Sequence, residues 1–158
     1  MIEDIDPPRY ELHISLRLFH GERRDLGELL RQWKLTANVE WQAGDPRRAA
    51  NGRELGGIRE DSYAFVRWPL PEKGRFAEVV ASIATALQPF QPHLQAFADE
   101  GGRAELFASW FFDANSGNTL DWRLMQKLAA LRIDLALDIY PPSDEPWLDS
   151  GYADEALA

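Results

Sequence analysis

The chain has 158 residues and an ordinary globular composition, 45% hydrophobic and 27% charged, which fits one domain that can bury a core without cross-links. It contains no cysteine, which excludes disulfides, iron–sulfur clusters, thiolate zinc sites and a cysteine nucleophile. The net charge of −9 argues against nucleic acid as a partner, because a phosphate-backbone binder needs a basic stripe.

The first predicted element is a strand over 11–20, with the sequence ELHISLRLFH. Apolar and polar residues alternate along it, the period-2 pattern of a strand with one buried face. We expect Leu12, Ile14 and Leu16 to be buried and this strand to be central to the sheet. A short amphipathic helix is predicted over 25–33, beginning at an acidic N-cap that forms a capping-box-like pair with an acid three residues later.

A second strand is predicted over 37–42, and a third over 62–68, where aromatic and branched residues are frequent. The stretch 43–61 between them is rich in glycine and carries balanced charges. Irregular segments of this length are uncommon in compact domains and are either functional or disordered. We expect this segment to be irregular, and mobile in preference to functional.

The clearest helix is predicted over 75–87, because its apolar residues recur at helical spacing. Prolines interrupt that pattern, and a further helical turn or two is expected over 92–100. A fourth strand is predicted over 103–112, where the sequence is RAELFASWFF.

A third main helix is predicted over 119–131, with Asn118 as its cap. The last strand, over 132–140, alternates without exception. Its predicted inward residues are Ile133, Leu135, Leu137 and Ile139, and its outward residues are Asp134, Ala136, Asp138 and Tyr140.

These elements predict an α+β fold. The expected architecture is a ferredoxin-like sheet of strand-helix-strand-strand-helix-strand order, extended by one helix–strand unit, with the helices on one face. Residues 11–140 form the single predicted domain. The acidic residues concentrate in 1–10 and 141–158, which we expect to be flexible ends, so that the body between them is nearly neutral.

Several motifs together resemble a bacterial domain-of-unknown-function family, DUF4279. They are the opening ELHISLRLF, the helix DLGELLRQW, the loop start at Gly44–Arg47, the RWPL at Arg67–Leu70, and the final LRIDLALDIY. The resemblance implies a small cytoplasmic bacterial α+β domain. It implies no known activity and no catalytic residue.

The sequence contains no recognisable catalytic or cofactor motif. Its three histidines lack the spacing of a metal site, and neither a nucleophile elbow nor a phosphate-binding glycine loop is present. No apolar run approaches the length of about 18 residues that a membrane helix needs. We therefore predict a cytoplasmic protein with no cofactor, no catalytic residue and no membrane or nucleic-acid partner.

The candidate binding residues lie on the outward face of the predicted sheet and in the arginine-containing loop. His13 and Arg17 of the first strand are expected to share a face with Asp134 and Asp138 of the last. Depending on register, either Tyr63 and Arg67 or Glu105 and Ser109 join them. The loop candidates are Arg47 and Arg48. A solvated face with weak ion pairs is the simplest interpretation, and a ligand or partner surface is the main alternative.

Two functions fit these observations. The first is a protein-binding module of the inhibitor or immunity type that blocks a basic partner, favoured by the small size, the acidic ends and the open sheet face. The alternative is a small-anion-binding or enzymatic domain that uses 43–61, whose arginines would hold an anion bidentately. A homodimer through the outer face or an edge strand is compatible with either.

Overall fold

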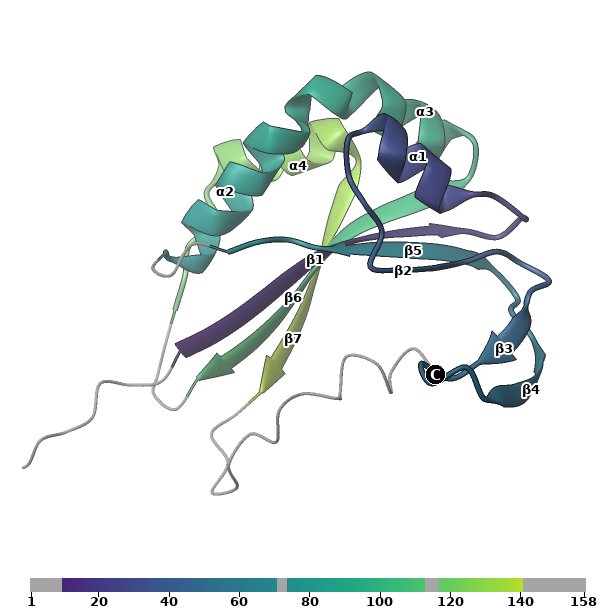
Figure 1. The fold of residues 1–158 in the computed structure, drawn as a ribbon. Helices are drawn as coiled ribbons and strands as arrows, with labels where there is room; N and C mark the ends of the chain where they lie inside the picture. The colour runs from purple at the N-terminus through teal and green to yellow at the C-terminus, as the bar shows by residue number, and fades with distance from the viewer. Residues whose placement is uncertain (1–9, 71–73, 113–116, 141–158) are drawn as a thin grey trace, which may run out of the picture.

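The computed structural model describes residues 10–70, 74–112 and 117–140. Its centre is a five-stranded sheet in the order β2-β5-β1-β6-β7, and Figure 1 shows the helices lying together on one face of this sheet. A separate two-stranded sheet, β3-β4, projects at one end. Residues 1–9 and 141–158, which hold the predicted flexible ends, are outside the described part of the chain.

The first strand is central, as predicted. β1 (Tyr10–His20) pairs antiparallel with β5 (Ser62–Arg67) on one side and with β6 (Gly102–Phe112) on the other. Leu16 and Leu18 are fully buried beneath the helices. The strict alternation of this strand therefore does correspond to one face turned to the core.

The helices cover the sheet with their apolar sides. The buried residues Val80 and Ile83 of one helix and Leu128 of another belong to the same core cluster as Leu16. The helices are α1 (Leu26–Gln32), α2 (Phe76–Leu87), α3 (Gln91–Asp99) and α4 (Trp122–Leu131), and a single 3₁₀ turn, Gln88–Phe90, joins α2 to α3.

One helix prediction is confirmed and one needs correction. The helix α3 has nine residues, as the prediction over 92–100 has, and Pro92 falls in its first turn, where the missing N–H costs no helical hydrogen bond. The helix α4 begins at Trp122 and is capped by Asp121, whose carboxylate accepts the N–H of Leu124 at 2.9 Å. An aspartate also interacts favourably with the positive end of the helix dipole, which favours it over Asn118 as the cap.

The prediction of an irregular segment over 43–61 is wrong. After β2 (Val39–Trp41), the chain forms a hairpin of β3 (Pro46–Arg48) and β4 (Glu54–Ile58). The glycines that suggested a loop supply its special backbone conformations, since Gly52 at the turn has a φ of +82°.

The predicted burial of Leu137 is also wrong. β7 (Ile133–Tyr140) pairs in parallel with β6 at the edge of the sheet. Ile133 at its start is 5% exposed, whereas Leu137 is 45% exposed and Ile139, which was also predicted to point inward, is 51% exposed. Figure 1 shows the second half of β7 running out from under the helical layer, so alternation there does not produce burial.

The α+β class and the placement of the helices on one face are confirmed. The ferredoxin-like plan is not confirmed. Along the chain, β3 and β4 lie between the second and third predicted strands, so the order of strands differs from that plan. The parallel pairing of β6 with β7 also makes the five-stranded sheet mixed.

Candidate functional site

The helix-free face of the sheet collects the polar residues that alternate with the core residues. Arg17 of β1 lies opposite Phe65 of β5 and opposite Glu105 of β6. Glu105 in turn lies opposite Asp134 of β7. The register therefore places the predicted residues of the first and last strands on one face, in one row across the sheet.

Arg17 and Glu105 form the centre of this face. The Nη1 atom of Arg17 lies 3.8 Å from Oε1 of Glu105, and the two side chains are 16% and 10% exposed. The other carboxylate oxygen of Glu105 accepts a hydrogen bond from the guanidinium of Arg103. The guanidinium carbon of Arg17 also stacks 3.4 Å from the ring centroid of Phe107. These contacts hold Arg17 in a fixed position.

Contacts between aromatic rings continue the array across the neighbouring strands. Tyr63 of β5 lies between Phe19, at 5.0 Å between ring centroids, and Trp41, at 4.4 Å. Arg59 stacks on Trp41 at 3.9 Å from its ring, and Arg103 stacks on Phe19 at 4.0 Å. We call the whole array the arginine–aromatic ladder; its members are Arg59, Trp41, Tyr63, Phe19, Arg103, Glu105, Arg17 and Phe107.

Three donor groups of the ladder are buried without a hydrogen-bond acceptor among the described residues. They are the hydroxyl of Tyr63, the Nε–H of Arg17 and the indole N–H of Trp41. Such groups are rare in folded proteins, because each forfeits its hydrogen bond to water, at a cost of about 1–3 kcal/mol.

The electrostatic environment keeps the Tyr63 hydroxyl neutral. Tyr63 is 1% exposed, and this burial raises the pKa of its hydroxyl to about 12. The positive charge of Arg17 lowers that pKa, while the carboxylates of Glu105 and Asp61 raise it. At neutral pH the group is therefore a hydrogen-bond donor.

His13 and Asp138 lie further along the same face. The residue between them across the sheet is Ser109, which is in register with both. The Nε2 atom of His13 lies 2.7 Å from Oε1 of Glu11, and Asp138 accepts a hydrogen bond from the Tyr140 hydroxyl. Both predicted residues are therefore engaged with neighbours on their own strands.

Arg67 and Asp134 occupy exposed positions on the face. Arg67 lies opposite Ser15, and its backbone N–H donates to Oδ1 of Asn38 at 2.7 Å. The pairs that the sequence left as alternatives, Tyr63 with Arg67 and Glu105 with Ser109, all lie on this face. The register of β5 and β6 against β1 places both pairs on this face. A single sequence does not specify this register.

The loop candidates Arg47 and Arg48 lie elsewhere. Both are on β3, in the separate two-stranded sheet, where adjacent residues point to opposite sides. Arg48 lies 3.5 Å from the carboxylate of Glu54. The arginine of this segment that reaches the ladder is Arg59, which sequence reasoning missed because its partner Trp41 is 18 positions away on another strand.

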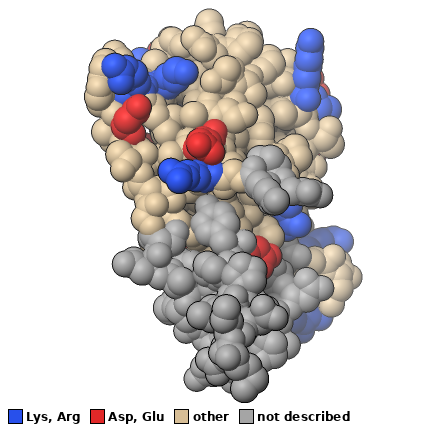
Figure 2. All heavy atoms as spheres, turned by 90° about the vertical axis from the view of Figure 1, so that its left-hand side faces the viewer, with Lys and Arg blue, Asp and Glu red and all other residues tan. Residues whose placement is uncertain are grey.

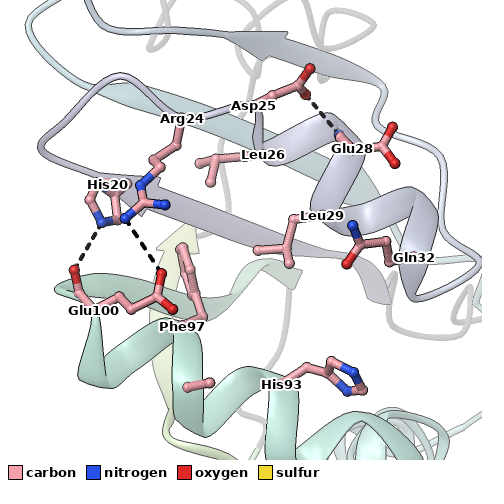
Figure 3. Close-up of a pocket in the computed structure, with 11 residues that line it drawn as sticks. His20, Arg24, Asp25, Leu26, Glu28, Leu29, Gln32, His93, Phe97 and Glu100 are labelled. Carbon is pink, nitrogen blue, oxygen red and sulfur yellow. Dashed lines mark hydrogen bonds and ion pairs between the residues drawn. The ribbon is translucent and has the colours of Figure 1, made fainter.

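A second concave feature lies among the helices, between α1 and α3 (Figure 3). This α1–α3 pocket has a volume of about 370 Å³. Its apolar lining consists of Leu26, Leu29, Ala96 and Phe97, and its polar lining of His20, Arg24, Asp25, Glu28, Gln32, His93 and Glu100.

His20 fixes one wall of this pocket. It is 4% exposed, and both ring nitrogens are hydrogen-bonded. Its Nδ1 accepts the backbone N–H of Glu22 at 3.0 Å, so its Nε2–H donates to the backbone carbonyl of Glu100, also at 3.0 Å. These bonds fix the tautomer of the ring and tie the end of β1 to the end of α3.

The charged surface shows no extended patch of one sign in the view of Figure 2. Lys and Arg side chains lie next to Asp and Glu side chains there, separated by uncharged residues. None of the helices in residues 10–70, 74–112 and 117–140 has the length and hydropathy of a membrane span.

The fold and the ladder together define a small α+β domain whose sheet presents an arginine-rich face away from its helices. A family model, that of a domain of unknown function (DUF4279), matches residues 10–142, and the chain belongs to this family. The resemblance drawn from the strand and helix motifs is thus confirmed. Comparison with curated proteins found no match, and neither did comparison with solved structures.

Proposed function

We propose that the protein is a protein-binding module, of the inhibitor or immunity type, that binds its partner through the arginine–aromatic ladder. The observation that carries this proposal is the gathering of arginine and aromatic side chains on the helix-free face, where the side chain of Arg103 is 51% exposed and Trp41 is half-buried. Arginine, tryptophan and tyrosine are also the residue types that contribute most binding energy at protein interfaces.

The chemistry of the ladder favours a partner segment that presents carboxylates or backbone carbonyls. Two of its guanidinium groups, on Arg17 and Arg103, face one carboxylate, that of Glu105. Carboxylates from a partner would pair with the exposed guanidinium of Arg103 and offset the positive charge that Glu105 leaves unbalanced. The acidic ends of the chain had suggested a basic partner, whereas the ladder supports an acidic one.

The alternative, a small-anion or enzymatic site in 43–61, has less support. Its arginines would need to converge on one ligand, but Arg48 contacts Glu54 and Arg59 stacks on Trp41. Arg23, which approaches this segment, is held by Asp45 at 2.9 Å. The guanidinium groups of Arg23, Arg48 and Arg59 are thus engaged with separate partners.

The proposal is tested by affinity capture from the native host with three forms of the protein. The wild type is compared with the ladder variant Arg59→Ser/Arg103→Ser and with the charge-matched control Arg123→Ser/Lys127→Ser, whose positions are exposed on α4. We expect a stoichiometric partner with the wild type and the control, and its loss with the ladder variant. Capture of no stoichiometric partner, or equal capture by all three forms, contradicts the proposal.

A further inference from the structure

We propose that the α1–α3 pocket binds a small organic cation, with an apolar body seated on Leu29 and Phe97 and an ammonium head group at the polar rim. The pocket is lined from α1 and α3, which Figure 1 shows on the helical side of the sheet, whereas the strand register places the ladder residues on the opposite face. The inference is therefore independent of the proposed protein partner.

The floor of the pocket is preformed. Phe97 is 6% exposed and Leu26 is 3% exposed. The ring of Phe97 lies directly against the backbone of Gly102, where an added Cβ would come within 2.4 Å of it. The hydrogen bonds of His20 fix the adjoining wall. A rigid apolar cavity of about 370 Å³ lies within the range of about 300–1,000 Å³ typical of small-molecule sites.

The charges around the pocket favour a cation. Three carboxylates line it, those of Asp25, Glu28 and Glu100. The guanidinium of Arg24 lies 3.5 Å from the carboxylate of Glu100. Arg31, which does not line the pocket, forms ion pairs with the carboxylates of Glu28, at 3.0 Å, and Asp25, at 3.8 Å. Two guanidinium groups thus face three carboxylates, which leaves one negative charge in excess.

Two polar side chains at the rim, both exposed to solvent, have no hydrogen-bond partner among the described residues. Figure 3 shows Gln32 on α1 and His93 on α3, on opposite walls, with Leu29 and Phe97 farther in. The amide oxygen of Gln32 and a neutral imidazole nitrogen of His93 both accept hydrogen bonds. An ammonium group at the rim would donate hydrogen bonds to Gln32 and His93, while the aromatic or aliphatic body of the ligand fills the apolar floor of the pocket.

The test is an NMR titration of the full chain with three probes that share one body, namely benzylamine, benzyl alcohol and benzoate. We expect benzylamine to shift the backbone amides of 26–32 and 93–100 with a Kd of about 1 mM, as suits so small a ligand. Benzyl alcohol should bind about fivefold more weakly, because it lacks the charge, and benzoate at least about tenfold more weakly.

Variants separate the pocket from non-specific binding. Leu29→Lys should abolish the benzylamine shifts, whereas Ile58→Lys, at a residue that is 62% exposed on β4, should leave them unchanged. Glu28→Gln leaves the floor intact and should weaken benzylamine about threefold without affecting benzyl alcohol. The inference is overturned if no probe shifts the pocket amides, if benzyl alcohol or benzoate binds as tightly as benzylamine, or if Glu28→Gln has no effect on benzylamine.

Discussion

The two faces of the five-stranded sheet differ in a way that burial alone does not reveal. Leu16 on the helix-covered face is 0% exposed, and Tyr63 on the helix-free face is 1% exposed. Leu16 has no polar group to satisfy, whereas the Tyr63 hydroxyl is enclosed without an acceptor among the described residues. The helix-free face thus gathers three such donors, on Arg17, Trp41 and Tyr63, whereas on the helical side the indole N–H of Trp33 is likewise buried without an acceptor among the described residues.

The largest expected effect is on the helix-covered face. Leu16→Ala should lower the free energy of unfolding by about 2–5 kcal/mol, through lost apolar burial and the cavity that remains. Ser15→Ala, one residue away on the other face, should change it by less than about 0.5 kcal/mol. Chemical denaturation measures both. Similar losses for the two variants would erase the distinction between the faces.

On the helix-free face, the largest effect is expected at Glu105. Glu105→Gln removes the charge that faces Arg17 and Arg103, and should cost about 2 kcal/mol, less than a fully buried pair because both neighbours keep some contact with solvent. Asp134→Asn, in the same row but exposed, is the control and should cost less than about 0.5 kcal/mol. Equal unfolding free energies for the two variants would show that Glu105 is not a central group of the face.

Gly102→Ala sharpens the description of the helical side. Because its new Cβ would meet the ring of Phe97, the variant should lose about 1–3 kcal/mol by overpacking. Gly21→Ala is the matched control, since nothing lies within 4 Å of a Cβ at that position. Thermal unfolding compares them, and a stable Gly102→Ala protein would mean that the floor of the α1–α3 pocket is not rigid.

The smallest predicted effect concerns pH and Tyr63. The pKa of its hydroxyl rises from 10.0 to about 12 on folding, so the unfolded chain releases this proton at a lower pH than the folded one. The contribution of this hydroxyl to the free energy of unfolding is fully present below pH 10 and decreases as the pH rises towards 12. At pH 11 the free energy of unfolding is lower by about 1.4 kcal/mol.

Tyr63→Phe provides the comparison. At pH 7 it should be neutral or slightly stabilising, because it removes a buried hydroxyl that has no acceptor among the described residues. The difference in unfolding free energy between wild type and variant should then move by about 1.4 kcal/mol in favour of the variant between pH 7 and pH 11. A difference that stays constant with pH would mean that the hydroxyl is accessible to water.

The sequence predicted those features that depend on local pattern. The alternation around Leu16 identified the central strand, and Asp25 is the N-cap of α1, accepting the N–H of Glu28 at 2.8 Å. Features that depend on neighbours far along the chain were not predictable. Trp41 meets Tyr63, and Arg17 meets Glu105, only through strand register. The exposure of Leu137 likewise follows from an edge position that alternation cannot report.

The central claim, that the helix-free face contacts a protein partner, is tested most directly by site-specific photo-crosslinking in the native host. A photo-reactive residue replaces Ser15, between Arg67 and Phe107 on the helix-free face, or Ser82, which is exposed on α2. We predict one dominant crosslinked species from position 15, none from position 82, and loss of the first when Arg59→Ser/Arg103→Ser is introduced. Crosslinking from position 82 alone, or no crosslink from position 15, would contradict the account.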